Sequence, residues 1–442
     1  MIIFGGGYDE CYEDPTFRLD ATNNVFSECN NKSMADGNAV YIADAKTGSV
    51  LWSISGRAKG ADNKHIQVPA MKHSVVGKIT TLDRDDDGMI DHLYFGDLGG
   101  QVFRVDLRNG QDVSGSVGVN NFTRRVVRVL NTSGDNDSGI TAKSLLQRGL
   151  QPRFYAQPSV SFHQDSGVLF AVVNIASGDR SNPLSRLRND IPKESDRLFG
   201  IIDRDIAKQG LYGKDEVVTL TSKELTLSSL TELPYKTSMG TKSNIEAAMR
   251  PNAATKQGWV YPLNLFDGFS NIKNVKSMGD GLAIGGVYSM TAYSPEMQYD
   301  EVSGCVAQIV GGSERQMYCL PYGICDDQTS LNGAGGFIRA GKGIQELAFG
   351  AVDSQHPTTR IMLGTQTLSE LVKMDDRINY DKGTTGTGAR LDTNCIGGNC
   401  AGSSLEKTPA GGSGSGGGEV TSLSYRLFPT RWYEQTADPL NE

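Results

Sequence analysis

Residues 82–97 read LDRDDDGMIDHLYFGD, and they place acidic side chains at alternate positions of a short loop. Counted from Asp83, the alternating aspartates fall at positions 1, 3, 5 and 9, with glycine at position 6. Ca²⁺ prefers about six to eight oxygen ligands, and a glycine permits the sharp turn that lets alternate residues face one ion. The predicted ligands are the carboxylates of Asp83, Asp85, Asp87 and Asp91 and the backbone carbonyl of Met89. Aspartates crowded so closely repel one another, and a cation removes that cost.

The residues after this loop predict a β framework rather than the flanking helices of an EF-hand. Position 12 of an EF-hand loop is a bidentate glutamate. Here it is Tyr94, inside residues 91–106, which read as two strands around a Gly-rich turn. Asp91 would then supply the bidentate oxygens itself. A solvated acidic turn without a metal is the alternative interpretation.

Size and composition favour a large folded protein whose partners are not nucleic acids. The chain has 442 residues, a net charge of −8 and 53 glycines. Nucleic-acid binding needs a basic face, and no dense cluster of Lys and Arg occurs. No apolar run is long enough for a transmembrane helix. Because residues 1–9 read as a strand entering a turn, we expect the chain to be a fragment of a longer precursor, with any signal sequence upstream of the residues given.

The seven cysteines predict an oxidising compartment outside the cytoplasm. Their closeness in sequence suggests local pairs that staple long loops. The expected pairs are Cys11 with Cys29, Cys395 with Cys400, and two of the three central cysteines, Cys305, Cys319 and Cys325. One thiol remains over, and spacing alone does not establish the connectivity.

A motif of two apolar β runs around an Asp/Gly turn recurs along the chain. It is clearest over residues 39–52 and 93–110, and weaker copies lie at 167–173, 196–203, 258–263, 283–293 and 360–365. The spacing, about 40 to 70 residues, suits propeller blades with inserted loops. We therefore predict one all-β propeller domain over residues 1–442, with long loop insertions. A pair of β-sandwiches is the competing fold.

Two segments near the C-terminus have distinct expected roles in this propeller. Residues 380–419 are rich in glycine and predict a flexible insertion. Residues 420–430 read as a closing strand, which we expect to pair with Met1–Phe4 and close the ring.

No constellation of catalytic residues is recognisable, so the sequence predicts a protein that is not an enzyme. The five histidines are scattered without metalloprotease spacing, and neither a nucleophile elbow nor a P-loop occurs. Residues 177–183, SGDRSNP, form a polar loop after a strand. A turn stabilised by side-chain hydrogen bonds is the favoured interpretation, and a ligand contact is the alternative.

Several of these segments together resemble the C-terminal propeller of the PilC/PilY family of type IV pilus biogenesis and tip adhesin proteins. The segments are residues 3–9, the hairpin at 41–52, the acidic loop with its following strands to 106, and residues 177–184. The resemblance covers most of residues 1 to about 300 and the last strand. Integrin-like propellers also contain such acidic loops, so the neighbouring segments carry the resemblance.

The resemblance implies a distorted seven-bladed propeller that is secreted and located at the pilus tip or outer-membrane surface. It also implies that Ca²⁺ binds at Asp83, Asp85, Asp87, the Met89 carbonyl and Asp91 and antagonises pilus retraction. Expected partners are minor pilins, the pilus tip complex and surface or host-cell receptors. Expected roles are pilus assembly, twitching motility and attachment. No Arg-Gly-Asp tripeptide occurs, so integrin binding through one is unsupported.

Two other functions remain as alternatives from the sequence. A quinone-dependent propeller dehydrogenase would share the Gly-rich hairpins, but three tryptophans are too few for its repeated docking motifs. A glycan-binding propeller is the other alternative.

Overall fold

The computed structural model describes most of the first 350 residues and two later strands. The described residues are 1–58, 64–84, 86, 88–107, 123–132, 151–185, 196–208, 211, 224–233, 239–251, 255–263, 265–266, 271–272, 274–284, 286–297, 310–324, 338–350, 359–363 and 418–423. Strands dominate them, as the sequence predicts. In this part of the chain no helix is long and apolar enough to cross a bilayer.

The first half of the chain forms two four-stranded sheets whose strand order follows the chain. The first contains β1 (Ile2–Gly5), β2 (Ala39–Ala43), β3 (Val50–Ser55) and β4 (His65–Gln67). The second contains β5 (Thr80–Leu82), β6 (His92–Gly96), β7 (Gln101–Leu107) and β8 (Thr123–Asn131). All neighbouring strands pair antiparallel except β3 and β4. Each sheet is thus largely a meander of consecutive strands.

Most of the remaining strands form three further sheets, in which strands near in sequence pair but the strand order departs from chain order in the third and fourth. The third sheet has the order β12 (Thr231–Glu232), β13 (Gly258–Pro262), β11 (Arg197–Asp203), β10 (Val168–Ala176) and β9 (Ser159–Asp165). The fourth has β16 (Lys276–Ser277), β18 (Val287–Ser294), β19 (Gly312–Cys319) and β20 (Ile338–Lys342), with β17 (Leu282–Ile284) also on β18. The fifth has β21 (Leu347–Gly350), β22 (Thr359–Leu363) and β23 (Gly418–Leu423).

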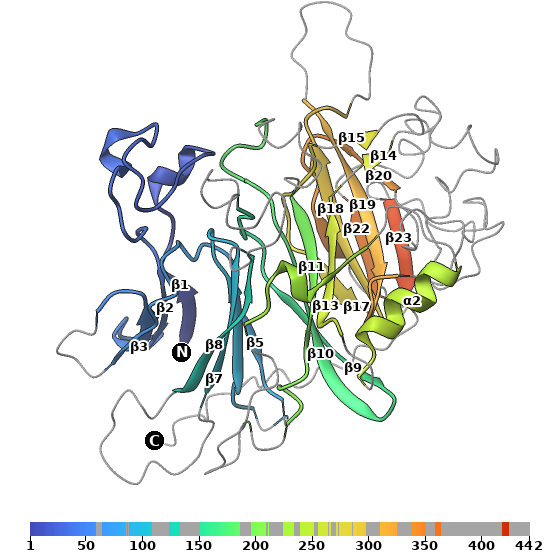
Figure 1. Ribbon diagram of the computed structural model, residues 1–442, viewed down its shortest axis with the longest axis horizontal. Helices are drawn as coiled ribbons and strands as arrows, with labels where there is room; N and C mark the ends of the chain where they lie inside the picture. The colour runs from blue at the N-terminus through green and yellow to red at the C-terminus, as the bar shows by residue number, and fades with distance from the viewer. Residues whose placement is uncertain are drawn as a thin grey trace, which may run out of the picture.

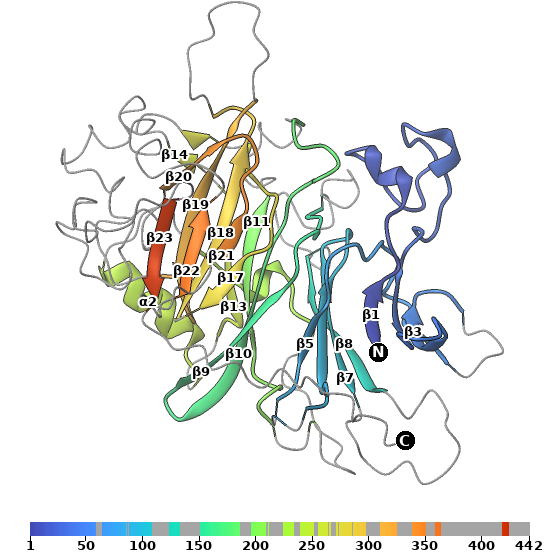
Figure 2. The same cartoon turned by 180° about the vertical axis from the view of Figure 1, so that it is seen from behind.

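Smaller elements complete the described fold. β14 (Leu265–Phe266) and β15 (Asn271–Ile272) form a two-stranded ribbon. The α-helix α2 (Met239–Met249) lies beside the later sheets, and short 3₁₀ helices occur at Glu10–Glu13, Ser27–Cys29 and Leu227–Ser229. In Figure 1 the first, second and third sheets follow one another across the molecule in chain order. The fourth and fifth sheets overlap beyond them, and Figure 2 shows the same arrangement from behind.

Neighbouring sheets pack face to face, and the inner sheets are buried on both faces. Along β6, Leu93 and Phe95 belong to the core shared with the first sheet, whereas Tyr94 between them belongs to the core shared with the third. Phe170 and Val172 of β10 face the fourth sheet in the same way, while Ala171 faces the second. Successive strand residues point to opposite faces, so a sheet buried on both sides has nearly continuous apolar strands.

The beginnings of four sheets meet at one cavity of about 440 Å³. Its walls come from the chain at or just before β5, β9, β17 and β21, and include Lys78, Ser159, Asp280 and Glu346. Early strands of successive sheets therefore surround a common point, as radial repetition requires. In the described chain this arrangement comprises five sheets of three or more strands. The predicted closed ring of seven blades remains a prediction.

The structure corrects the predicted pairing of the two chain ends. β23 pairs with β22, with Thr359 opposite Leu423, whereas β1 pairs with β2. The two strands lie in different sheets at opposite sides of the molecule (Figures 1 and 2). β23 supplies the third strand to the β21–β22 hairpin, which would otherwise leave the free edge of β22 uncovered.

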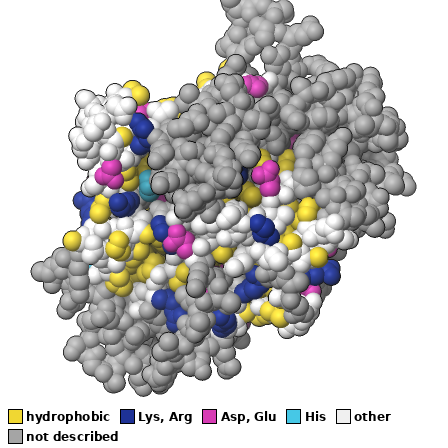
Figure 3. Space-filling view, in the orientation of Figure 1, with side chains coloured by type: hydrophobic (Ala, Val, Ile, Leu, Met, Phe, Trp, Pro, Cys, Tyr) yellow, Lys and Arg dark blue, Asp and Glu magenta, His cyan; other side chains and the backbone are white. Residues whose placement is uncertain are grey.

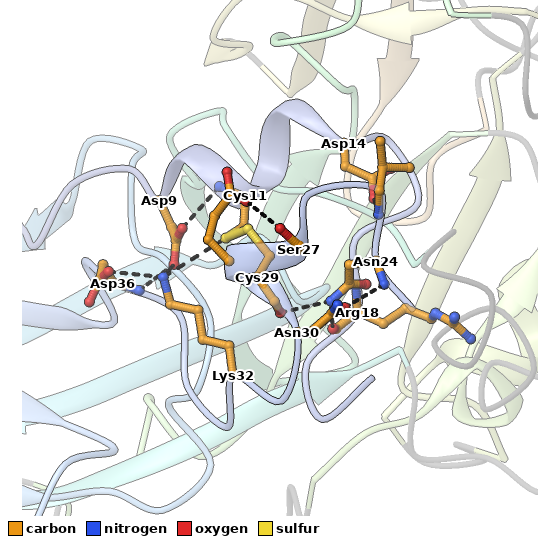
Figure 4. Close-up of a disulfide and its surroundings, with 12 residues drawn as sticks. Asp9, Cys11, Asp14, Arg18, Asn24, Ser27, Cys29, Asn30, Lys32 and Asp36 are labelled. Atoms are coloured by element: carbon orange, nitrogen blue, oxygen red, sulfur yellow. Dashed lines mark hydrogen bonds and ion pairs between the residues drawn. A yellow bond between two sulfur atoms is a disulfide. The ribbon is translucent and has the colours of Figure 1, made fainter. Parts of the chain in front are cut away.

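Residues 8–36, here called the N-terminal disulfide loop, form a compact excursion between β1 and β2 (Figure 4). The predicted Cys11–Cys29 disulfide is present, and Cys319 is disulfide-bonded as well. The buried Asp9 carboxylate accepts a hydrogen bond from the Cys11 amide at 3.0 Å and pairs with Lys32 Nζ at 2.6 Å. Cys395 and Cys400 lie outside the described residues.

On the face shown in Figure 3, the described Lys and Arg side chains are spread among acidic, apolar and neutral ones.

Candidate calcium-binding site

The acidic loop connects β5 to β6, two antiparallel strands paired up to Leu82 and His92. The Asp91 amide donates to the Leu82 carbonyl at 2.7 Å and closes the hairpin beneath the loop. Its location in a β-hairpin confirms the sequence prediction. Of the predicted ligands, Asp83, Met89 and Asp91 are described, whereas Asp85 and Asp87 lie outside the described residues.

Two carboxylates of the predicted ligand set accept hydrogen bonds from backbone amides within the loop. Asp83 Oδ2 accepts a hydrogen bond from the Gly88 amide at 2.8 Å, and Asp91 Oδ2 accepts one from the Arg84 amide at 2.7 Å. Asp86 and Gly88 have φ angles of 61° and 84°, in the left-handed region. Glycine adopts this region without steric cost and aspartate tolerates it better than most residues. The sequence therefore places suitable residues at both bends.

The predicted ligands that the structure describes differ in how deeply they are buried. Asp91 is 1% exposed, and its carbonyl accepts a hydrogen bond from the Leu107 amide, so the sheet fixes its position. Asp83 is exposed, as is Met89 at 45%. One side of the loop is thus attached to the sheet and the other faces solvent. Carboxylate and carbonyl oxygens are the donors that Ca²⁺ prefers, so the donor set fits this ion. In the described chain, which excludes Asp85 and Asp87, no cluster of three acidic, His or Cys residues forms a metal site.

Arg84 connects the loop to the third sheet. Its guanidinium NH1 donates to the Ile206 carbonyl, which lies just after β11. The amides of Asp205 and Ile206 in turn donate to Asp203 Oδ1, at 3.0 and 3.3 Å. A residue between two predicted ligands therefore contacts a turn of the neighbouring sheet.

A buried ionic network lies in the sheet that carries the loop. Arg104 on β7 is fully buried; its Nε contacts Asp106 Oδ1 at 2.8 Å and its NH1 contacts Asp203 Oδ2 at 2.5 Å. His92 Nδ1 is 2.8 Å from Asp106 Oδ1, and the Tyr94 hydroxyl donates to Asp203 Oδ2 at 2.8 Å. The network joins β6 and β7 to β11, and hence the second sheet to the third.

The opposite charges of this network offset the cost of burying each charged group. Burial alone would raise the pKa of Asp106, but the hydrogen bond from His92 and the charge of Arg104 hold that pKa below its ordinary value. Burial likewise opposes the charge of Arg104, yet Asp203 and Asp106 raise its pKa well above the ordinary value. Burial and the Asp203 charge raise the pKa of Tyr94, which stays a neutral donor.

Sequence reasoning did not find this network. The available signal was the presence of His92, Arg104 and Asp106 in strands whose other residues are mostly apolar. Polar side chains at such positions need buried partners.

Residues 177–183 stabilise the N-terminal disulfide loop, and the turn interpretation is confirmed. Asp179 Oδ1 accepts the Ser181 hydroxyl at 2.7 Å, and Asp179 Oδ2 lies 3.1 Å from NH1 of the buried Arg153. Ser181 Oγ and Asn182 Nδ2 donate to the carbonyls of Tyr12 and Glu13. These polar groups have structural partners.

His73 gives the same region a predicted pH dependence. Its Nδ1 lies 2.7 Å from the Tyr12 hydroxyl. Burial, with smaller contributions from the positive charges of Lys72 and Arg153, lowers the pKa of His73 to about 4. An unfolded histidine takes up its proton near pH 6.5, so acidification from about 6.5 to 4 favours the unfolded state; above that window both states are neutral.

We therefore expect His73→Gln, which keeps a hydrogen-bond acceptor but does not titrate, to lose less stability than the wild type over this window. Urea denaturation at pH 7, 6, 5 and 4 measures the difference. His163→Gln is the comparison variant. Burial also lowers the pKa of His163, but this side chain is less buried than His73, so its substitution should change the pH slope less. Equal pH slopes for the wild type and His73→Gln would show that His73 is not the titrating group.

Comparison with known proteins gives a similarity in structure but none in sequence. No protein-family model matches the sequence, and no curated protein matches it either. Among solved structures, the chain is similar to the C-terminal domain of PilY1 from Pseudomonas aeruginosa, at 16% sequence identity and a TM-score of 0.43. The match covers 73% of this chain and 64% of that domain, so the chain spans less than two thirds of its length.

Proposed function

We propose that this chain is a non-enzymatic, calcium-binding module of a type IV pilus biogenesis factor and adhesin. The observation that carries the calcium part is the loop at 83–91, where alternate aspartates lie in a β-hairpin and two of them hold the loop wound. The pilus part rests on the sequence segments that resemble the PilC/PilY family. The disulfide between Cys11 and Cys29 supports an extracellular location. The pilus tip or outer-membrane surface is the location that the family resemblance implies.

We also propose that the sheets belong to a distorted seven-bladed propeller. Three observations support this arrangement: consecutive strands build each sheet, successive sheets share cores, and four sheets begin around one cavity. Radial repetition of this kind leaves only short sheet edges.

Asp83, Asp85, Asp87, the Met89 carbonyl and Asp91 would hold the ion. Calcium, when bound, supplies the positive charge that offsets the repulsion among these aspartates. Arg84 follows Asp83 directly and contacts Ile206, so an ordered loop holds the turn after β11 in place. The ordered loop and the turn after β11 form one surface. This surface contacts minor pilins, the pilus tip complex or a surface receptor, and the contact regulates pilus extension, retraction and attachment.

A binding assay with purified minor pilins tests this function. We expect the chain to retain a minor pilin in millimolar Ca²⁺ and to release it in chelator, because the contact surface includes the ordered loop. Millimolar Mg²⁺ is the control, since Mg²⁺ demands a tighter octahedral geometry. Equal retention in Ca²⁺ and chelator, or no binding of any minor pilin, would contradict the proposed regulation.

A further inference from the structure

Arg315 is a fully buried arginine at the centre of β19. It lies opposite Thr291 of β18 on one side and Ile338 of β20 on the other. Its neighbours on the strand, Glu314 and Gln316, alternate with it and point to the opposite face of the sheet. Arg315 therefore lies on the face that turns away from the core shared with the third sheet, where Tyr318 packs.

In the part of the chain that the structure describes, the Arg315 guanidinium lacks the hydrogen-bond partners that a buried charge requires. Within the described part of the chain, Nε, NH1 and NH2 of Arg315 are all buried without a hydrogen-bond partner, and so is the hydroxyl of Thr291 directly opposite. Burial lowers the pKa of Arg315 to about 9, partly offset by the charge of Glu314, so the side chain remains charged at neutral pH. A buried charge whose N–H donors have no hydrogen-bond partners is strongly destabilising.

Two other arginines in this protein show how it normally satisfies such a group. Arg104 and Arg153 are equally buried. Arg104 contacts the carboxylates of Asp106 and Asp203. Arg153 contacts the carboxylate of Asp179 and two backbone carbonyls. Arg315 is the exception among these three.

The Arg315 side of the sheet lies close to the cavity where the sheets begin. A Cβ atom on Gly279 would be 3.6 Å from Thr291 Oγ1 and 3.2 Å from Glu346 Cγ. Asp280, the residue after Gly279, lines the cavity together with Glu346. The Thr291 hydroxyl therefore lies close to residues that line the cavity, although Thr291 itself does not line it.

We propose that Arg315 and Thr291 form a buried anion-binding subsite behind this cavity, which takes one oxyanion group, a carboxylate or a phosphate. A guanidinium presents a planar fork of N–H donors that matches two oxygens of such a group, and the Thr291 hydroxyl adds a further donor. The bound anion supplies hydrogen-bond acceptors and a counter-charge on the face of the sheet opposite to that of Glu314. The subsite is independent of the calcium loop, which lies in another sheet.

Thermal unfolding with inorganic phosphate and with acetate, each titrated at constant ionic strength, tests the subsite. We expect one of the two anions to raise the melting temperature of the wild type in a saturable way, and the comparison identifies the preferred class. Arg315→Met should abolish the shift, and Thr291→Val should weaken binding about tenfold, the effect of one hydrogen bond to a charged group. Arg57→Met removes the same charge from an arginine whose side chain is 59% exposed, and should keep the full shift.

The stability of Arg315→Met without added anion is a second measurement, in which the variant should not be weaker than the wild type. Because Arg315→Met removes an uncompensated charge, it should be at least as stable as the wild type in buffer without phosphate or acetate. Absence of a shift for both anions, or an equal shift in Arg315→Met, would overturn the proposal. So would a strong destabilisation of both Arg315→Met and Glu346→Gln in every buffer, which would assign the arginine an internal partner.

Discussion

Arg104→Met is expected to lower the free energy of unfolding by about 3–5 kcal/mol, the usual cost of removing one partner from a buried ion pair. The substitution leaves the carboxylates of Asp106 and Asp203 buried without the guanidinium that contacts both. His92 and Tyr94 still bond to these carboxylates, but neither replaces a permanent positive charge. Urea denaturation at neutral pH measures the loss.

Arg125→Met is the matched control for this experiment. Arg125 Nε lies 3.4 Å from Asp106 Oδ2, but the side chain is 21% exposed and is not central to the network. Its removal should cost about 1 kcal/mol or less, as for other partly solvated pairs. A loss below about 1 kcal/mol for Arg104→Met itself would contradict the assignment of this network as the connection between the second and third sheets.

The double variant Asp85→Ala/Asp87→Ala is expected to abolish the stabilisation of the wild type by calcium. An ion that binds only the folded protein adds about 2.7 kcal/mol at 100 times its dissociation constant. In chelator the effect should reverse, because two repelling carboxylates are gone and the variant should be as stable as the wild type or more so. Urea denaturation in calcium and in chelator measures both states.

Asp86→Asn controls for the loss of charge. Asp86 is exposed, lies outside the alternating positions and has a φ of 61°, which asparagine tolerates. This variant should keep the calcium-dependent stabilisation. A double variant that responds to calcium like the wild type would show that Asp85 and Asp87 are not ligands.

The features that sequence predicted well depend on local patterns. The acidic loop, its glycine and the strands after it are contiguous, so their hairpin was predictable from turn and strand signals. The Cys11–Cys29 disulfide joins residues only 18 apart. The polar loop at 177–183 was also assigned correctly as a structural turn, because its serine, asparagine and aspartate favour such turns.

The features that sequence missed depend on contacts between sheets. Asp203 is 99 residues from Arg104, and nothing in either segment identifies the other as its partner. The pairing of β23 with β22, rather than with β1, likewise depends on which sheet edge remains free after the other strands have assembled. That the buried Arg315 guanidinium has no hydrogen-bond partner among the described residues is visible only once the strands around it are placed.

Isothermal titration of the wild-type chain with calcium tests the central claim most directly. The loop at 83–91 predicts one saturable site with a dissociation constant of about 10⁻⁴ to 10⁻³ M, the range of extracellular calcium modules. The same titration of Asp85→Ala/Asp87→Ala should give no binding heat above dilution. Absence of saturable binding to the wild type, or an unchanged isotherm in the double variant, would contradict the account.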